Sequence, residues 1–467
     1  MRYVSTRGGA DPAGFADVLL GGRAPDGGLW WPEAWPRLLP REVAACAARP
    51  LAATAADLLV RFSGGALDPD AAAAATRDAA ATFVHSGPDP LRELEPNLWL
   101  HDLTFGPTGS AADFEMQVLA RLIEAEMTAR RETRTLVLAT AGDDGGAAVE
   151  AFAGRRRLRL IVLFPDGRLS PRRLRQVAGA HAGNVRALAV DGNYEACRAL
   201  ADGLFADPAL VSEARLASIG PENPVRLPLQ VAPWLAAAAR LGAPGRSMAL
   251  AAPCGEASLA VAAWTALRLG ADDGRVLLGA NAHDGLVQLF AAGRFALSSA
   301  EASASPELDV DAPIAFERLY FEAVGGNALE TARAMQALGE TGRVDLPPSA
   351  AAALSPFAAA LADDVEMART LVQVRNDTGE LLDPSTAVVV SAARRLAGGG
   401  AGPVIVPALA HASLSAEVVE AITGETPALP RQMSSLDARE PRYERIGTDI
   451  EAFRQFVRAL TGQSRAA

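Results

Sequence analysis

The chain has 467 residues, half of them hydrophobic and 21% charged, which predicts a folded protein of two or three domains and excludes a disordered one. Its net charge of −11 argues against nucleic acid or an anionic membrane as partner. No segment is apolar for long enough to span a bilayer, and the N-terminus lacks the apolar run of a secretory signal. Three widely spaced cysteines indicate reduced thiols without a zinc pattern, so we expect a cytoplasmic protein. All 44 basic residues are arginines, and the chain contains no lysine.

The first ninety or so residues are predicted to form a separate, mostly helical unit with a short N-terminal strand. Alanine-rich runs over 41–62 and 68–83 favour helices, and Asp68 followed by Pro69 is typical of a helix start. A Pro/Gly-rich stretch marks a boundary near Pro90. We therefore expect one domain over 1–90 and a second over 91–467.

Beyond this boundary, short apolar runs alternate with amphipathic segments such as 112–132, which predicts parallel strands joined by helices. The expected buried strands begin at Thr135, Leu158, Val185, Ser247, Arg275 and Pro403. The fold class predicted from the residues is therefore α/β. In such folds ligands bind beyond the carboxyl ends of the strands, so candidate site residues are sought in the turns that follow them.

Several segments, in order and with matching spacing, resemble the threonine synthase family. They are RYVSTRG from Arg2, ADVLLGGRAPDGGLWWPE from Ala16, VLFPDGRLSPRRLRQV from Val162, GANAHDGL from Gly279, FERLYFEAVGG from Phe316 and LLDPSTAV from Leu381. The resemblance implies the fold-type II architecture of pyridoxal phosphate (PLP) enzymes, similar to tryptophan synthase β. It implies two interleaved α/β subdomains with a cleft, the smaller at roughly 130–210, behind the N-terminal extension. Family members make threonine from O-phosphohomoserine, with PLP as a Schiff base on one lysine.

The family's lysine loop is matched by FGPTGSAADF, which begins at Phe105. The flanking Gly-Pro-Thr and Asp-Phe place the lost lysine position at Ala112. A Schiff base needs a primary amine, and guanidinium groups do not replace it.

The turn after the first buried strand matches the loop that takes the substrate carboxylate in the family, so Thr140, Gly142 and Asp143 are expected to bind substrate. Asp144 stands where the family has threonine, and there it would repel a carboxylate. The plainer interpretation, which we favour, is that Asp144 only caps the following helix.

The segment from Cys254 to Leu259 matches the family's phosphate loop, but it lacks the second glycine and carries Glu256. A phosphate beside a buried carboxylate is costly. With the lysine also missing, we expect no cofactor and no PLP binding. Cys254 is more simply an apolar core residue than a nucleophile.

The remaining candidates are two binding and two catalytic residues. By resemblance, Arg226 would bind an anion and Thr386 would contact the cofactor ring, although Thr386 also lies at a helix start where it would cap. His283 and His411 are suited to proton transfer near neutral pH, although a lone histidine is more often a packed or surface residue. No metal site is expected, because adjacent aspartates are a weak signal.

Three functions remain open. The first is a PLP-independent lyase, cyclase or isomerase acting on a small polar, amino-acid-like metabolite, with His283, Glu256, Asp144 and His411 as acid–base groups. The second is a non-catalytic pseudoenzyme that serves as a binding partner or ligand sensor. The third is a threonine synthase with non-covalent PLP. We expect a monomer or homodimer, leave a protein partner open, and expect no nucleic acid or membrane.

Overall fold

The computed structural model describes residues 1–84, 90–271, 273–298, 302–398 and 402–462. Within them, no helix combines the length and apolarity needed to cross a membrane. The N-terminal part pairs strands β1 and β2 antiparallel and then continues as helices. Its elements are β1 (Tyr3–Ser5), α1 (Phe15–Gly21), β2 (Trp30–Pro32), α2 (Pro40–Ala45), α3 (Leu51–Ser63) and α4 (Pro69–Ala80).

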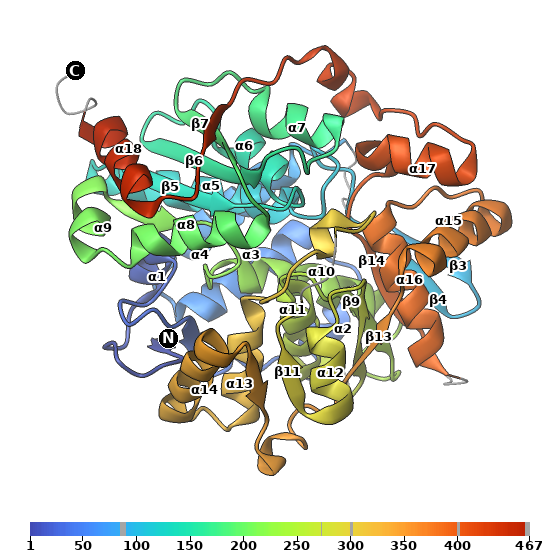
Figure 1. Cartoon of the computed structure of the whole chain (residues 1–467). Helices are drawn as coiled ribbons and strands as arrows, with labels where there is room; N and C mark the ends of the chain where they lie inside the picture. Colours follow the sequence, from blue (N-terminus) through green and yellow to red (C-terminus); the bar gives the residue numbers. More distant parts are fainter. Residues whose placement is uncertain (85–89, 272, 299–301, 399–401, 463–467) are drawn as a thin grey trace.

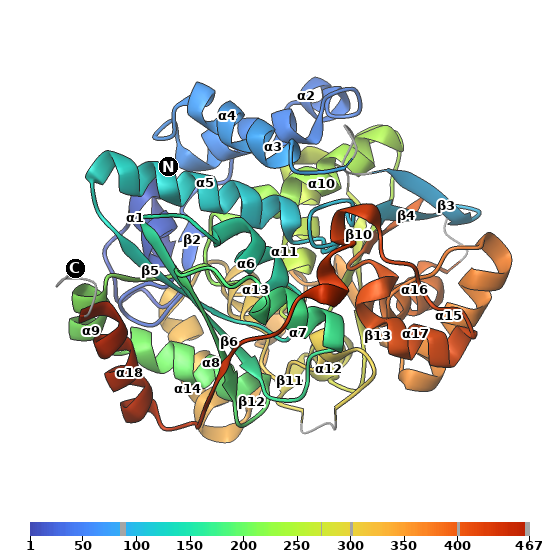
Figure 2. The same ribbon diagram turned by 90° about the horizontal axis from the view of Figure 1, so that it is seen from above.

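Helix α4 begins as the sequence predicts. The Asp68 carboxylate accepts a hydrogen bond from the backbone of Ala71, and Pro69 occupies the first turn, where its missing N–H costs nothing. Helices α3 and α4 pack on α10 (Arg226–Arg240) and α5 (Asp113–Arg130), as Figure 2 shows at its upper edge.

The smaller sheet has five strands, all parallel, in the order β15-β7-β6-β5-β8. Alternate residues face opposite sides, so Leu136 and Leu138 pack toward α6 while Val137 packs toward α8 and α18. The strands are β5 (Arg134–Ala139), β6 (Leu158–Pro165), β7 (Val185–Val190), β8 (Leu216–Ser218) and β15 (Glu444–Ile446). The helices around them are α6 (Gly145–Phe152), α7 (Pro171–Ala178), α8 (Tyr194–Phe205), α9 (Pro208–Ala214) and α18 (Ile450–Gly462).

The larger sheet has six strands in the order β13-β10-β9-β14-β4-β3, and only β3 runs antiparallel to its neighbour. Figure 1 shows it in the lower right, beside α16 and α15. Gly279 lies so close to α16 that an added Cβ would meet the Val389 backbone at 2.7 Å. The strands are β3 (Leu91–Glu95), β4 (Leu98–Asp102), β9 (Ala249–Pro253), β10 (Arg275–Ala280), β13 (Phe357–Leu361) and β14 (Val404–Ala408).

The other elements complete the layers around this sheet and the connections between the two sheets. They are α11 (Ser258–Ala266), η1 (Leu267–Ala271), α12 (Gly285–Ala292), β11 (Arg294–Ala296), η2 (Pro306–Leu308), α13 (Ala315–Ala323), α14 (Ala328–Thr341), β12 (Arg343–Asp345), η3 (Pro348–Ala350), α15 (Asp364–Thr378), α16 (Pro384–Ala397), η4 (Ala412–Ser415), α17 (Ala416–Thr423), η5 (Arg431–Met433) and η6 (Leu436–Ala438).

The fold confirms the predicted α/β class and all six expected strands, which are β5, β6, β7, β9, β10 and β14. The turns after β5, β9 and β14 face one another, with the loop 103–112 between them. This arrangement places a cavity at the carboxyl ends of strands from both sheets.

Candidate functional site

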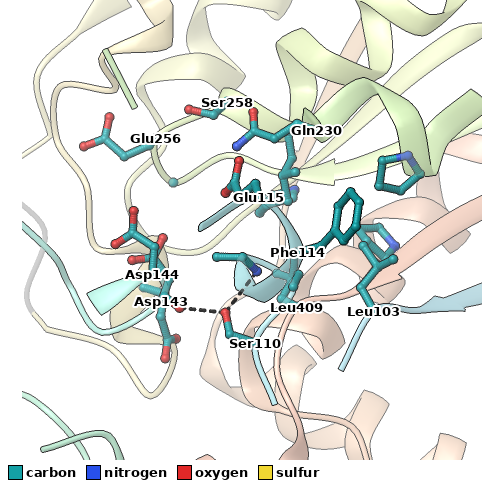
Figure 3. A pocket seen from close by; sticks show the side chains of 18 of the residues that line it. Leu103, Ser110, Phe114, Glu115, Asp143, Asp144, Gln230, Glu256, Ser258 and Leu409 are labelled. Carbon is teal, nitrogen blue, oxygen red and sulfur yellow. Dashed lines mark hydrogen bonds between the residues drawn. The ribbon is translucent and has the colours of Figure 1, made fainter. Parts of the chain in front are cut away.

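A cavity of about 120 Å³ lies between the two sheets (Figure 3). Its walls come from the loop before α5, the turns after β5 and β9, one face of α10, η2 and the start of α16. The polar groups among its described lining are His101, Ser110, Glu115, Asp143, Asp144, Arg173, Arg226, Gln230, Glu256, Ser258, Glu307, Asp383 and Ser385.

Arg226 is buried at the first turn of α10 and bridges two carboxylates. Its guanidinium donates to Asp144 Oδ2 at 2.9 Å and to Glu115 Oε1 at 2.7 Å. Burial lowers the pKa of Arg226, the two carboxylates raise it, and the net shift is upward. The side chain predicted to bind an anion is therefore already neutralised by the protein.

Asp144 does not cap α6, contrary to the interpretation favoured from the sequence. Its carboxylate turns to Arg226 because a buried charge gains more from a guanidinium than from a helix N–H. Burial raises the pKa of Asp144, although Arg226 opposes the shift.

The turn between β5 and α6 is organised by Thr140. Its hydroxyl oxygen accepts hydrogen bonds from the backbone N–H groups of Gly142 and Gly145, at 2.9 and 3.1 Å. Gly142 has φ +118°, a backbone conformation that residues other than glycine rarely adopt. The turn presents Asp143 to the cavity, and burial, followed by the charge of Asp144, raises the pKa of Asp143 to about 7.

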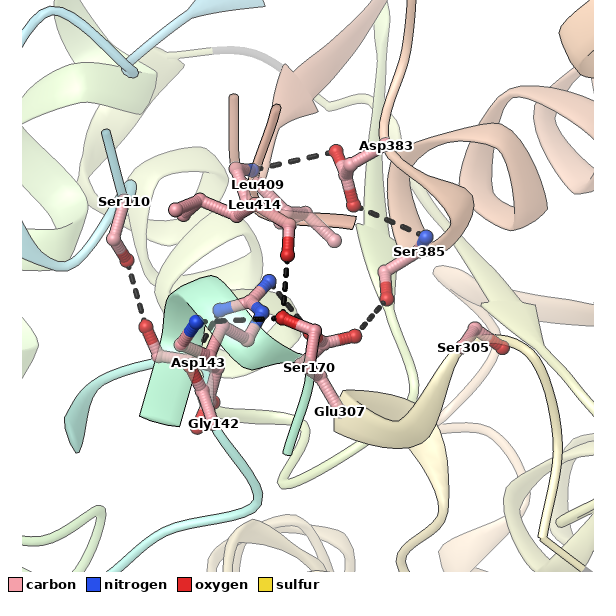
Figure 4. A network of polar contacts seen from close by, with 12 residues as sticks. Ser110, Gly142, Asp143, Ser170, Ser305, Glu307, Asp383, Ser385, Leu409 and Leu414 are labelled. Atoms are coloured by element: carbon pink, nitrogen blue, oxygen red, sulfur yellow. Dashed lines mark hydrogen bonds and ion pairs between the residues drawn. The ribbon is translucent and has the colours of Figure 1, made fainter. Parts of the chain in front are cut away.

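A second buried ion pair crosses the cavity from α7 to η2 (Figure 4). Arg173 lies 2.5 Å from Glu307 Oε1 and also donates to the carbonyl of Gly142. The Ser385 hydroxyl donates to Glu307 Oε2 at 2.6 Å. This chain of contacts connects the smaller sheet to the start of α16.

Glu256 follows β9 and joins the two sheets. It accepts hydrogen bonds from the Tyr194 hydroxyl at 2.5 Å and from the Ile314 backbone at 2.6 Å, and Arg198 lies 3.7 Å away. Burial raises the pKa of Glu256. Burial also raises the pKa of the Cys254 thiol, which suits an apolar core residue and disfavours a thiolate.

Five predicted residues lie outside the lining of this cavity: Thr140 and Gly142, in the turn described above, and His283, His411 and Thr386. His283 contacts Asp311, with Nδ1 2.7 Å from Oδ1. His411 lies 2.8 Å from the Ser413 hydroxyl beside a different cavity, and burial lowers its pKa. Thr386 donates to the Asp383 carboxylate, so Ser385, one residue earlier, faces the cavity instead.

The polar lining residues that were not identified from the sequence include Glu115, Arg173, Glu307 and Ser385. Glu115 had a usable signal, because it follows Ala112 by three residues and therefore shares its helix face. Arg173 and Ser385 lie inside segments already matched to the family, without a pattern that marks them. No sequence pattern marks Glu307, because its position at the cavity depends on how the chain folds around η2.

Comparisons with known proteins cover nearly the whole chain. The family model described as pyridoxal-phosphate dependent enzyme matches residues 82–374, and those for the threonine synthase N terminus and C-terminal region match 2–79 and 386–457. Threonine synthase from Pseudomonas aeruginosa is 31% identical over 98% of both chains. The chain belongs to the threonine synthase family.

Two further members agree with this assignment. Threonine synthase from Corynebacterium glutamicum is 29% identical over 98% of both chains. The crystal structure of PLP-bound threonine synthase from Brucella melitensis superposes with a TM-score of 0.91 at 33% identity, over 99% of both chains.

Membership in the threonine synthase family contradicts three expectations. The PLP-independent lyase, cyclase or isomerase and the pseudoenzyme are both overturned, because full-length relatives are threonine synthases. The expectation of no cofactor is overturned by the match to PLP enzymes and by the PLP-bound relative. These predictions were wrong because they gave a few replaced side chains more weight than a fold retained across both sheets.

The cavity lining nevertheless does not fit a PLP group attached through lysine. The chain has no lysine, and Ala112, just before α5, brings only a methyl group to the cavity. The Arg173–Glu307 pair crosses the space, and Glu256 lies in the turn after β9. Carboxylates at low dielectric repel a phosphate group.

Proposed function

We propose that this member of the threonine synthase family binds a small, amino-acid-like metabolite in the cavity between the sheets. Ala112 stands where the family carries its lysine, so any PLP that the protein uses is held without a covalent bond. The protein thus departs from an ordinary family member in its attachment chemistry.

The observation that carries this proposal is a cavity whose polar lining comes from both sheets. Strand carboxyl ends in α/β folds are the usual place for small ligands, and a few convergent polar groups are typical of such sites. Relatives named threonine synthases act in amino-acid synthesis, which supports an amino-acid-like ligand.

Calorimetric titration with L-homoserine and with O-phosphohomoserine, each with and without PLP, tests ligand binding. We expect the protein to bind at least one of them. Ala111→Phe should weaken binding at least about tenfold, because the ring fills the cavity. Val365→Ala, on the exposed face of α15, should leave binding unchanged. Absence of binding under all four conditions would refute the proposal.

A separate experiment tests whether PLP forms a covalent bond with the protein. After incubation with PLP and reduction with borohydride, mass spectrometry of the peptide containing Ala112 should show no added mass. A parallel activity assay with PLP and O-phosphohomoserine should measure the threonine that is released. A covalent adduct on this peptide would disprove the non-covalent proposal.

We further propose a cytoplasmic protein, since its three cysteines are free and buried. A monomer or homodimer, a division into 1–90 and 91–467, and roles in ligand chemistry for His283 and His411 remain predictions. Sedimentation velocity would give the oligomeric state.

A further inference from the structure

The charges that line the cavity are strongly unbalanced. Six acidic side chains face two guanidinium groups among the described lining residues. The acids are Glu115, Asp143, Asp144, Glu256, Glu307 and Asp383, and the bases are Arg173 and Arg226. Such an excess favours a ligand with positive charge, because buried carboxylates need a counter-charge or a proton.

Most of these carboxylates already have partners. Arg226 neutralises one oxygen each of Glu115 and Asp144, while Arg173 neutralises Glu307. Glu256 lies near Arg198, which comes from α8 rather than from the cavity wall.

Asp383 is satisfied without a cation. Its carboxylate accepts from the backbone of Ser385, Thr386 and Ala410 and from the Thr386 hydroxyl, as expected for the cap of α16. It is therefore not available to a ligand.

Asp143 is different. Within the described parts of the chain, no arginine or histidine nitrogen lies within ion-pair distance of its carboxylate. Its side chain accepts a long hydrogen bond from the Thr140 hydroxyl at 3.3 Å, and the Asp144 backbone N–H also contributes a hydrogen bond to it. Although protein surrounds it, Asp143 keeps accessible surface, and it lines the cavity. A carboxylate in this position is open to a ligand.

Glu115 supplies an independent observation. The residue is only 5% exposed, and its Oε2 has no hydrogen-bond partner, although Oε1 binds Arg226. Figure 3 shows this carboxylate between Gln230 and the Asp143–Asp144 turn. A buried acceptor without a donor is costly and marks a place where a donor is missing.

We infer that the cavity binds the ammonium group of its ligand, through Asp143 and the free oxygen of Glu115. An ammonium group carries three N–H donors and one positive charge, which is enough for both acceptors. Both residues line the same cavity, and the Asp144–Arg226–Glu115 bridge joins the residue next to Asp143 to Glu115. This inference rests on the proposed ligand site and names the ammonium group as the part of the ligand that is recognised there.

The test compares four small probes by calorimetry at pH 8. L-Homoserine carries an ammonium and a carboxylate, 3-aminopropan-1-ol keeps only the ammonium, 4-hydroxybutanoate keeps only the carboxylate, and inorganic phosphate represents a bare anion. We expect the two amines to bind at least about tenfold more tightly than either anion. Tighter binding of 4-hydroxybutanoate or phosphate would overturn the inference while leaving the ligand site intact.

Variants identify the groups responsible. Asp143→Asn should weaken both amines at least about tenfold, and Glu115→Gln should weaken them as well. Asp284→Asn, at the start of α12 and outside the cavity, is the matched control and should bind normally. Full amine affinity in folded Asp143→Asn protein would overturn the inference. No binding of any probe, of O-phosphohomoserine or of PLP would instead reject the proposed ligand site.

Discussion

At the scale of single residues, both arginines that line the cavity are paired with carboxylates, whereas two acidic side chains keep oxygens without a cation. Arg226 and Arg173 each hold at least one carboxylate, so neither guanidinium is free for an incoming anion. Asp143 and one oxygen of Glu115 face the same space without a cation. From the sequence, Arg226 was predicted to bind an anion. In the structure its charge is neutralised by Glu115 and Asp144.

Arg226→Met should lower the free energy of unfolding by about 3–5 kcal/mol, because it leaves Glu115 and Asp144 buried without their cation. Urea denaturation at pH 8 measures the loss. Arg226→Lys should lose less, since it keeps the charge but not the two-armed geometry. Arg2→Met removes an exposed ion pair and should stay within about 1 kcal/mol. A similar small effect for Arg226→Met would refute the bridging role.

At the scale of elements, the two sheets are joined by side chains that cross the cavity. Helix α7 reaches η2 through Arg173 and Glu307, and α8 reaches the turn after β9 through Tyr194 and Glu256. The loop before α5 meets the turn after β5 through the Ser110 hydroxyl and the Asp143 carbonyl, 2.8 Å apart. These contacts hold the cavity walls in one arrangement.

Glu307→Met should destabilise the protein by about 3–5 kcal/mol, because Arg173 stays buried without its carboxylate. The double variant Arg173→Met with Glu307→Met should recover most of this loss, since neither buried charge remains. Thermal and urea denaturation of both single variants and the double variant give the coupling energy. Additive losses would show that the pair does not act as a unit.

At the scale of the whole molecule, buried acids give stability a common dependence on pH. Burial is the largest influence on Asp113 and Asp383, and it raises their pKa values to about 7 and about 6. Burial shifts the pKa values of Asp144 and Glu256 in the same direction. In the folded state these groups hold protons that the unfolded chain has already released above about pH 4.

The free energy of unfolding should therefore fall as pH rises from 6 to 8, by about 1 kcal/mol from Asp113 alone. Stability from a raised pKa is fully present below the unfolded value and is lost as pH passes the folded value. Asp113→Asn should make the pH profile flatter. Asp70→Asn, at an exposed position of α4, should leave it unchanged. Stability that increases over this range would contradict the prediction.

Local patterns were sufficient for much of the fold. Six central strands were predicted because strands buried on both faces are continuously apolar, and the start of α4 was predicted because Asp68 and Pro69 form a cap. The strands β3, β4, β8, β13 and β15 of the two sheets were missed. β8 and β15 have only three residues each, and β13 lies at a sheet edge, so each has a weak apolar signal.

Residue type and order along the chain were enough to establish the α/β class, the resemblance to threonine synthases and the absence of lysine. The pairing of buried charges followed from the folded structure alone, because an ion pair depends on distance and burial between segments far apart in sequence. Asp144 meets Arg226 and Arg173 meets Glu307 across 82 and 134 residues. Only when these ion pairs are known can Asp143 and one oxygen of Glu115 be recognised as carboxylate groups without a cation.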